Sequence, residues 1–581
     1  MISLIKHKFP IYLLSTYFLF FSSIVIGQSY IDYRSPFHPT SGQSGMVVSQ
    51  NKLSSDLGIE ILNKGGNAVD AAVAVGFSLA ITLPRAGNLG GGGFMLVYIK
   101  EKNEIFYIDY RSQSPLNANL EHLFGDKLPK DLDYQDFDIV REGYKASAIP
   151  GTVAGLLDAH ANFGKLPLDE ILEPVIKQAR DGIIVSYDLF KAIESTSQLA
   201  NDPESKKIYF KNNAPIAEGS LMKRPDLANT IQNISDNGKS GFYSGDIAKA
   251  FIKAMESNGG FFTLEDFKNY KSRISSPIVT SYRDHLVFTA GPPSGGGATL
   301  LTALNVLSFF DLKESESNSS KTYHLMAEAL RRGHNNRSHH IGDPNFYDVP
   351  VEKLLSKERT IELMESFKAD KATPSSKIKP LKIKNESKDT THYSIIDRDG
   401  NAVSNTYTLG YSFGSGVTIP GTGILMNNQM NNFAYRYGDK SIEGRTASPG
   451  NKFKPGKRPM STMAPTMVFD ENFQLMLITG SPGGSYIPAA ILRVVSGVVD
   501  FNLDIGQATM LPRVHKDWPY KGLDYEEQVS YDTVEILKKL GHKPEPNKTM
   551  GSTQSIHIKN GTNYGYADLR RPGAGVSIQN N

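Results

Sequence analysis

The chain has 581 residues, with 63 lysines and arginines against 60 aspartates and glutamates, for a formal net charge of +3. This balance, without a basic stripe interleaved with aromatics, argues against a nucleic-acid partner and favours a small molecule or peptide. The lack of cysteine excludes disulfides, thiolate metal sites and a cysteine nucleophile, so covalent chemistry would have to use Ser, Thr, Lys or a carboxylate.

The first 27 residues predict a cleavable secretory signal. Lys6 and Lys8 precede an apolar run over residues 11–21, and a small-residue end follows at Gly27. The run is shorter than the roughly 20 residues that a membrane span needs, although a retained anchor is the alternative. We therefore expect an exported protein, periplasmic or extracellular.

The segment 54–111 is predicted to contain helices, a glycine loop and strands. A first helix ends at a Gly-Gly pair, and a helix rich in small residues runs from Asn67 to about Ile81. Glycines 90–93 form a loop that leads into a strand, and "IFYIDYRSQSP" supplies another strand that ends at Arg111. Helices of small residues beside such loops are expected to pack closely against a sheet.

A helical region and then a strand-rich region follow along the chain. Residues 150–370 carry helical spacing with Gly or Asp punctuation. Residues 366–389, "SFKADKATPSSKIKPLKIKNESKD", are rich in lysine and indicate an exposed, mobile segment. Beyond them strands are predicted over "THYSIID", "AVSNTYTL", "GILMNN", "PTMVFD" and "LMLITG".

The stretch "THYSIIDRDGNAVSNTYTL" predicts a β-hairpin. Asp397 and Gly400 suit the first and fourth positions of a type I turn, with the glycine left-handed in a three-residue loop. In that register Thr390 lies opposite Thr408 at the open end of the hairpin. A two-residue turn would instead pair Thr391 with Thr408.

A threonine after an exposed segment can act as a nucleophile only if a base removes its proton. Its own α-amino group can do so once it becomes an N-terminus, because a free α-amine titrates near neutrality. This hypothesis predicts self-cleavage between Asp389 and Thr390. The alternative is that these are ordinary strand threonines.

Three further motifs carry polar groups next to strands. In "TGSPGGS", the amides of Gly483 and Gly484 can point at an oxyanion, although most Gly-Gly turns are only turns. "KRPMSTM" offers the adjacent hydroxyls of Ser461 and Thr462. "NNQMNNF" clusters amides around Gln429, more polar groups than a plain buried strand end needs.

The segments "GNAVDAAVA", "AGNLGGGGF", "TTHYS", "TYTL", "NNQM", "KRPMSTM", "TGSPGGS" and "MGSTQSI" stand in the order found in the γ-glutamyltransferases, which are N-terminal-nucleophile hydrolases. The chain resembles this family over nearly its whole mature length. The resemblance implies an α/β fold, a four-layer αββα sandwich. It also implies a precursor, with residues 1–27 as signal peptide, that cuts itself after Asp389 into a large subunit (28–389) and a small catalytic subunit (390–581), which stay together as a heterodimer.

The resemblance implies a role for each motif. Thr390 would be the nucleophile for self-cleavage and catalysis, with Thr408 hydrogen-bonded to it. The remaining roles would be an oxyanion hole from Gly483 and Gly484, an α-carboxylate site from Arg111, Ser461 and Thr462, and a contact near the α-amino group from Gln429. The implied reaction transfers the acyl group of a γ-glutamyl amide such as glutathione to water, an amino acid or a peptide, without cofactor or metal.

Two departures from the family pattern bear on the substrate. Gly410 stands where the family commonly has Asn after "TYTL", and Asn432 stands where an aspartate is expected against the substrate ammonium. Charge-assisted hydrogen bonds are roughly twice as strong as neutral ones, so preference for a free α-amino group should weaken. A related acylase acting on glutaryl or cephalosporin-type amides is therefore an alternative, and an inactive, unprocessed binding protein is a second one.

Two other patterns match functional motifs but are interpreted as chance matches. "GYSFG" at residues 410–414 matches the nucleophile elbow G-x-S-x-G, but "SGVTIPGTG" after it cannot form the helix that an elbow requires. His339 and His340 lack the helical spacing of two metal ligands and are expected to be solvated residues of a helix face.

Overall fold

The computed structural model describes residues 36–127, 131–133, 135–378, 390–435, 448–520 and 522–579. The predicted signal peptide, the segment 379–389 and Asp389 itself lie outside the described residues. The chain divides into two compact units, Met1–His38 and Pro39–Asn581, and the second carries all the features below. Among the helices of the described ranges, none combines the length and hydrophobicity of a membrane span.

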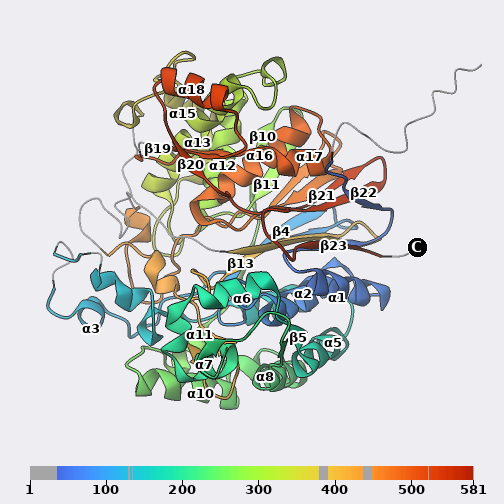
Figure 1. Cartoon of the computed structure of the whole chain (residues 1–581), viewed down its shortest axis with the longest axis vertical. Coiled ribbons are helices and arrows are strands. Elements are labelled where there is room, and N and C mark those ends of the chain that lie inside the picture. The colour runs from blue at the N-terminus through green and yellow to red at the C-terminus, as the bar shows by residue number, and fades with distance from the viewer. Residues whose placement is uncertain are drawn as a thin grey trace, which may run out of the picture. The chain divides into compact units, whose positions relative to one another are not determined.

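Two seven-stranded antiparallel sheets form the centre of the second unit (Figure 1). The first sheet has the order β1 (Thr40–Gly42), β22 (Thr562–Ala567), β21 (Gln554–Lys559), β17 (Leu475–Thr479), β16 (Thr466–Phe469), β11 (His285–Thr289) and β10 (Ile278–Tyr282). The second sheet has the order β23 (Gly575–Ile578), β2 (Met46–Ser49), β12 (Thr391–Ile396), β13 (Ala402–Thr408), β3 (Gly92–Ile99), β4 (Glu104–Tyr110) and β9 (Arg273–Ser275). Each sheet therefore combines strands from before and after residue 390.

Alternating side chains explain why the second sheet is buried on both faces. Met46 and Val48 of β2 join Phe94 in a cluster with residues of the first sheet, whereas Val47 belongs to the cluster under the helices. Successive strand residues point to opposite faces, so a strand apolar at every position needs a partner layer on each side. One layer is the other sheet, and the other is helical.

Helices cover both outer faces (Figure 1). The second sheet packs against a group that comprises α1 (Lys52–Asn63), α2 (Ala68–Thr82), α4 (Thr152–Phe163), α5 (Leu168–Asp181) and α8 (Pro225–Asn237). The first sheet packs against α12 (Gly295–Leu307), α13 (Ser320–His340), α16 (Ile487–Val499) and α17 (Ile505–Met510). This is the four-layer αββα sandwich that the sequence resemblance implied.

The remaining elements lie at the periphery of these layers. The other helices are α3 (Leu120–Phe124), α6 (Tyr187–Glu194), α7 (Pro203–Tyr209), α9 (Ser240–Tyr243), α10 (Gly245–Ser257), α11 (Leu264–Asn269), α14 (Val351–Leu355), α15 (Lys357–Met364) and α18 (Tyr531–Lys539). The other strands are β5 (Ile183–Ile184), β6 (Phe210–Lys211), β7 (Ala214–Pro215), β8 (Leu221–Met222), β14 (Thr418–Ile419), β15 (Ile424–Leu425), β18 (Val514–His515), β19 (Gly522–Glu526) and β20 (Lys543–Asn547).

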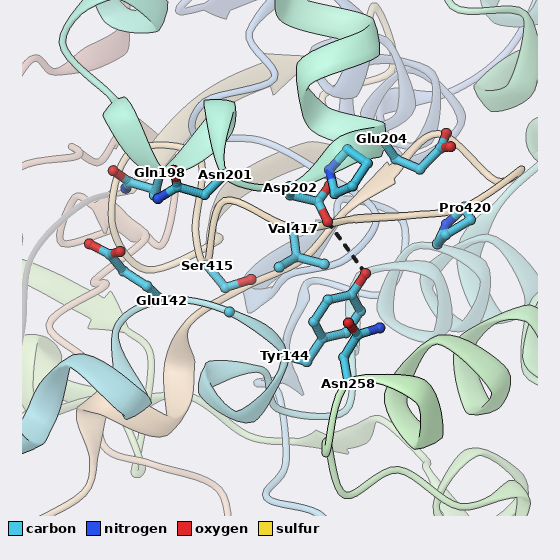
Figure 2. Close-up of a pocket in the computed structure, with 12 residues that line it drawn as sticks. Glu142, Tyr144, Gln198, Asn201, Asp202, Glu204, Asn258, Ser415, Val417 and Pro420 are labelled. Atoms are coloured by element: carbon cyan, nitrogen blue, oxygen red, sulfur yellow. Dashed lines mark hydrogen bonds between the residues drawn. The ribbon is translucent and has the colours of Figure 1, made fainter.

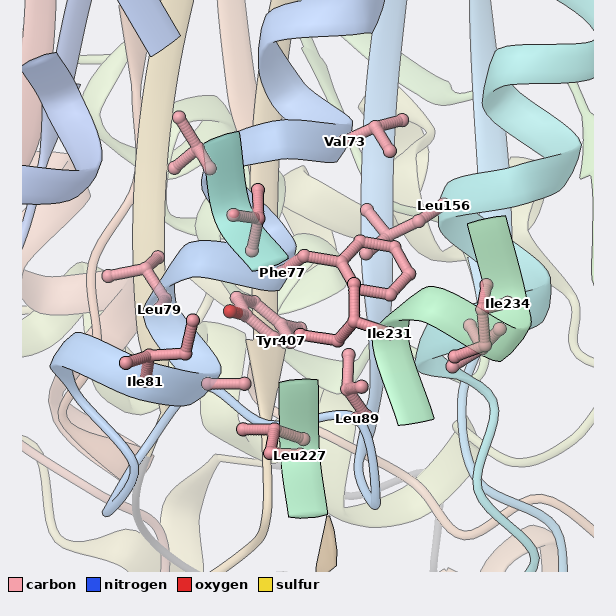
Figure 3. Packing of buried hydrophobic residues seen from close by; sticks show 14 of the residues in the cluster. Val73, Phe77, Leu79, Ile81, Leu89, Leu156, Leu227, Ile231, Ile234 and Tyr407 are labelled. Carbon is pink, nitrogen blue, oxygen red and sulfur yellow. The ribbon is translucent and has the colours of Figure 1, made fainter. Parts of the chain in front are cut away.

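The helix α2 is buried on all sides, as its small residues predicted. It begins after Asn67, whose side chain accepts hydrogen bonds from Val69 N and Asp70 N in a capping box. Every residue of the helix is buried, which is typical of a helix that is apolar all round. Figure 3 shows Phe77 of α2 beside Tyr407 of β13 in this core.

Candidate active site

The predicted hairpin is formed by β12 and β13. Their register pairs Thr391 with Tyr407, and Asp397 N donates to Asn401 O at 3.0 Å across the loop. Gly400 closes the turn with a left-handed φ of +84°. The register that places Thr390 opposite Thr408 is therefore confirmed, and the alternative pairing of Thr391 with Thr408 is wrong.

Thr390 and Thr408 lie buried at the open end of this hairpin, 4% and 3% exposed. Thr408 Oγ1 accepts a hydrogen bond from Gly410 N at 2.8 Å, and its carbonyl accepts one from Gln429 Nε2 at 2.7 Å. A Cβ at Gly91 would come within 2.3 Å of the same carbonyl oxygen, which explains the glycine loop before β3. Gln429 thus contacts the main chain of Thr408.

The loop containing Gly483 and Gly484 follows β17 and leads into α16. Both glycines have positive φ, +129° and +57°, and a Cβ at Gly483 would lie 2.8 Å from Gly551 Cα. The same loop begins at Gly480, where a Cβ would lie 2.4 Å from the ring of His392. Because His392 is two residues after Thr390, its side chain connects the hairpin to this loop.

His392 is held as a neutral imidazole between the sheets. Its ring nitrogens hydrogen-bond the hydroxyls of Thr406 at 2.8 Å and Ser394 at 3.0 Å. Burial lowers the pKa of His392 to about 3. The charged imidazolium form is therefore not populated near neutral pH, and the ring contributes by its position.

Arg111 and Asn432 contact each other directly. Arg111 Nη2 donates to Asn432 Oδ1, and Arg111 Nε donates to the carbonyl of Pro459 at 3.2 Å. Both side chains are buried; Arg111 directly follows β4, and Asn432 lies in the segment after β15. The predicted carboxylate-binding and amine-binding positions are thus neighbours.

Ser461 and Thr462 are buried in a segment that packs against the start of α12. The carbonyl of Ser461 accepts hydrogen bonds from Gly295 N at 2.6 Å and Gly296 N at 3.2 Å. The hydroxyl of Ser461 accepts one from Met463 N at 3.2 Å. The carbonyls of Pro459 and Met460 accept from Arg111, so Ser461 and Thr462 directly follow the residues that the arginine contacts.

Gly410 has a backbone that suits only glycine. Its φ is +105°, and a Cβ would lie 2.1 Å from Asn428 Oδ1. That oxygen accepts a hydrogen bond from Tyr411 N at 2.9 Å, while Asn428 Nδ2 donates to Arg141 O at 2.9 Å. The Asn428 amide fills the space that a side chain at 410 would take. The "GYSFG" segment forms turns without a following helix, so it is not a nucleophile elbow.

The expectation that His339 and His340 are solvated is wrong. They are 2% and 8% exposed, because α13 is covered by neighbouring segments, and the His339 ring packs 4.6 Å from that of Trp518. Burial lowers their pKa values to about 2 and about 4. They are neutral core residues.

Three buried ligand-type side chains do meet elsewhere, at His324, Glu328 and His542. His324 Nδ1 and His542 Nε2 are hydrogen-bonded at 2.8 Å. Glu328 accepts from Arg332 at 2.5 Å and from Thr373 N at 3.1 Å. These contacts account for the cluster as a structural network.

A cavity of about 380 Å³ lies near the segment after Gly410 (Figure 2). Tyr144 and Ser415 line it, and the Tyr144 hydroxyl donates to Asp202 Oδ2 at 3.4 Å. None of the predicted site residues is among the residues that line this cavity. It is separate from the hydroxyl pair at Thr390 and Thr408.

Sequence reasoning missed the residues that hold the site together. Asn451 accepts from Met460 N at 2.8 Å and donates to Asn432 O at 2.7 Å, so it joins two predicted motifs. Arg458 binds Asp109, two residues before Arg111, at 2.7 Å. The only sequence signal was that Arg458 precedes "PMST" and that Asp109 lies in "IDYRS".

Known proteins resemble this chain over most of its length. A family model described as gamma-glutamyltranspeptidase matches residues 54–578. The glutathione hydrolase proenzyme of Escherichia coli (strain K12) is 39% identical over 538 residues, covering 92% of each protein. An acylase ACY 1 proenzyme of Pseudomonas sp. (strain SE83) is 33% identical, covering 94% of this chain and 96% of that protein.

Solved structures of other proteins also resemble this chain. Cephalosporin acylase from Bacillus halodurans superposes with a TM-score of 0.82 at 25% identity, covering 96% of this chain and all of that one. Helicobacter pylori gamma-glutamyltranspeptidase has a TM-score of 0.53 at 37% identity, covering 57% of this chain and 93% of that one. The chain belongs to the γ-glutamyltranspeptidase family.

Proposed function

We propose that the chain is a self-processing γ-glutamyltransferase and glutathione hydrolase with Thr390 as its nucleophile. The observation that carries the proposal is the placement of Thr390 opposite Thr408, buried at the end of a central hairpin. The glycine loop at Gly483 supports it, because His392 links that loop to the nucleophile strand. The Escherichia coli glutathione hydrolase proenzyme is 39% identical to this chain and the acylase ACY 1 proenzyme 33%, which favours a γ-glutamyl substrate.

Self-processing would precede catalysis. The Thr390 hydroxyl attacks the carbonyl carbon of Asp389, the peptide C–N bond breaks, and an ester forms while the nitrogen becomes an amine. Water then hydrolyses the ester, releasing the carboxylate of Asp389. The new α-amino group of Thr390 is the base that the nucleophile needs.

Catalysis then repeats this chemistry on a substrate. Thr390 Oγ attacks the γ-carbonyl, and its proton passes through the α-amine to the leaving amine. The amides of Gly483 and Gly484 stabilise the oxyanion. Water or an acceptor amine attacks the resulting ester, which releases glutamate or a new γ-glutamyl amide and restores the hydroxyl.

Substrate binding is assigned to the buried polar group around Arg111. Its guanidinium, with the hydroxyls of Ser461 and Thr462, would hold the α-carboxylate, because a guanidinium suits a planar anion. Asn432 and Gln429 would face the α-amino group. Gly410 contributes backbone only. We further propose export through the N-terminal signal and a mature heterodimer of residues 28–389 and 390–581.

Two measurements test this proposal on the full chain. Denaturing electrophoresis with N-terminal sequencing should show a fragment that begins at Thr390, and Thr390→Ala should remain one band. Hydrolysis of γ-glutamyl-p-nitroanilide should exceed that of glutaryl-p-nitroanilide, which lacks only the α-amino group. A persistent full-length native chain would contradict self-processing. Faster hydrolysis of the glutaryl compound would replace the proposed substrate by that of an acylase.

A further inference from the structure

Two segments that are distant in the sequence, 109–111 and 458–460, bind each other beside the candidate carboxylate site. We call this contact the clasp. The Arg458 guanidinium donates to the Asp109 carboxylate at 2.7 Å and to the Asp109 carbonyl at 2.9 Å. In return, Arg111 donates to the carbonyls of Pro459 at 3.2 Å and Met460 at 3.4 Å. Each segment thus contributes an arginine that binds the other segment.

A second ion pair anchors this clasp. Asp343 accepts from Arg458 N at 2.9 Å and from Arg273 Nη1 at 2.6 Å. Arg273 faces Asp109 in the β4–β9 ladder, and Arg273 Nη1 lies 3.6 Å from Asp109 Oδ2. Two arginines and two aspartates therefore alternate, so the network is neutral although Asp109, Asp343 and Arg458 are almost fully buried.

The clasp fixes the position of Arg111 from both sides of its backbone. Asp109 Oδ1 accepts a hydrogen bond from Arg111 N at 2.9 Å, and the Tyr270 hydroxyl donates to Arg111 O at 2.9 Å. The Arg458 guanidinium lies 5.4 Å from the Tyr270 ring centre. Movement of Arg458 would therefore disturb both groups that hold the Arg111 main chain.

A lysine could not replace Arg458 in this arrangement. The guanidinium reaches Asp109 through Nη1 and the carbonyl of Lys271 through Nη2, and the single nitrogen of a lysine could not occupy both of these positions. Burial opposes the charged form, but Asp109 keeps the pKa of Arg458 above its ordinary value. The side chain therefore stays charged and in place.

We infer that Arg458 and Asp109 are positioning residues that set the spacing between the Arg111 guanidinium and the Ser461–Thr462 hydroxyls, and so determine recognition of the substrate carboxylate. This inference rests on the proposed function, in which those groups bind the α-carboxylate. Neither Arg458 nor Asp109 needs to touch the substrate. A small displacement of the clasp would weaken carboxylate binding while the hydroxyl pair at Thr390 stays in place.

Two variants of the full chain test the inference, Arg458→Lys and Asp109→Asn. The matched control is Arg283→Lys, because Arg283 forms an ion pair with Asp500 at 2.9 Å in the β10–β11 corner, outside the clasp. Each variant is assayed with γ-glutamyl-p-nitroanilide and with 4-aminobutanoyl-p-nitroanilide, which keeps the amine and lacks the carboxylate. Self-cleavage yield and Tm are measured first to establish folding.

We expect KM for the γ-glutamyl compound to rise roughly ten- to hundredfold in both clasp variants, since misplacement by about 1 Å can cost about 100-fold. We expect kcat to change little, and kcat/KM for the carboxylate-free compound to stay at its native value. The control should change neither. In an Arg111→Ala background, Arg458→Lys should raise KM no further, because its effect passes through Arg111.

Equal losses on both compounds, or no loss on either, would overturn the inference and leave the clasp with a purely structural role. If Arg458→Lys fails to cleave itself, the milder Asp109→Asn decides between these outcomes by the same ratio. Failure of the proposed function is a different result, because then the native chain itself stays uncut or prefers the glutaryl compound.

Discussion

Asn432 offers a neutral amide oxygen where the proposed function places the substrate ammonium. In the structure that oxygen accepts a hydrogen bond from Arg111, so the same atom would have to serve both partners. A carboxylate at this position could bind both with charge assistance, which roughly doubles the strength of such hydrogen bonds. Under the proposed function, the identity of residue 432 would therefore control how much the α-amino group contributes to binding.

We predict that Asn432→Asp raises the preference for γ-glutamyl- over glutaryl-p-nitroanilide by about tenfold, equivalent to about 1.4 kcal/mol. The ratio of the two kcat/KM values is the measurement. Asn431→Asp is the control, because Asn431 is the neighbouring buried amide, whereas the hydrogen bond described for Arg111 in this segment goes to Asn432. An unchanged ratio in Asn432→Asp would remove residue 432 from amine recognition.

Gly410 should tolerate no side chain, since its left-handed backbone is combined with a blocked Cβ direction. We predict that Gly410→Ala lowers Tm and slows self-cleavage. Gly421→Ala isolates the cost of backbone strain alone, because Gly421 also has a left-handed φ, +73°, but no atom within 4 Å of a built Cβ. That cost is of order 1 kcal/mol. Equal effects of the two substitutions would show that the Asn428 contact is unimportant.

At the scale of elements, the hairpin shows what a sequence can specify by itself. Its register follows from the turn, because Asp397 and Gly400 determine where the chain reverses and alternation then sets every facing pair. The buried helix α2 was predictable for a similar reason, since its small residues and capping Asn67 are adjacent in the sequence. Local chemistry favoured the observed structure in both cases, although for the hairpin it left a two-residue turn as the alternative.

Contacts between distant segments were not predictable in this way. Arg458 and Asp109 lie in different motifs, and only the packing of the 458–460 segment against the end of β4 brings them together. His339 and His340 look polar in the sequence, yet tertiary contacts bury them. The roles of the site residues, including the cut after Asp389, remain predictions.

Asp397 ties the hairpin turn to the start of α2. Its Oδ1 accepts from Asp399 N and Asn401 N, and its Oδ2 accepts from Ala68 N, each at 2.9 Å. The β16–β17 turn provides a matched pair of turn bonds, in which Asp470 Oδ1 accepts from Asn472 N at 2.9 Å and Gln474 N at 2.8 Å. The Asp397 turn differs from this one in the link to a helix, in a further hydrogen bond from Asn401 Nδ2 to Asp397 Oδ2 at 2.9 Å, and in the burial of Asp397.

We predict that Asp397→Ala lowers the free energy of unfolding by about 1–3 kcal/mol more than Asp470→Ala, because it leaves the buried amide of Ala68 without its acceptor. The comparison is made by Tm in the uncut Thr390→Ala chain. Self-cleavage should survive Asp397→Ala, because the turn lies at the far end of the hairpin from Thr390. Equal Tm losses would show that the helix link contributes nothing.

Across the whole molecule, buried neutral histidines should make the fold sensitive to acid. Burial lowers their pKa values from 6.5 to about 2 for His339, about 3 for His392 and His542, and about 4 for His340 and His557. Below pH 6.5 the unfolded chain therefore binds more protons than the folded chain. Stability should be full above pH 6.5 and fall as the pH drops toward about 4.

The expected slope is about 1.4 kcal/mol per pH unit for each histidine, partly offset by Asp397 and Asp500, whose pKa values burial raises. The measurement is Tm of the Thr390→Ala chain from pH 7.5 to 4.5. His557→Gln should make stability fall less steeply as the pH drops, because the unfolded chain then takes up one proton fewer. A Tm that stays constant between pH 6.5 and 4.5 would contradict the assignment of these rings as neutral.

Each sheet contains strands from before and after residue 390. A cut at this residue would therefore change how the protein can refold. As one polymer, the chain brings β12 and β13 to β2 and β3 within a single molecule. After a cut, the same pairing requires two separate molecules to meet, so recovery from denaturant should depend on protein concentration. The uncut Thr390→Ala chain should refold with a yield that dilution does not reduce. Once unfolded, the processed protein would regain its fold only when its two fragments associate again.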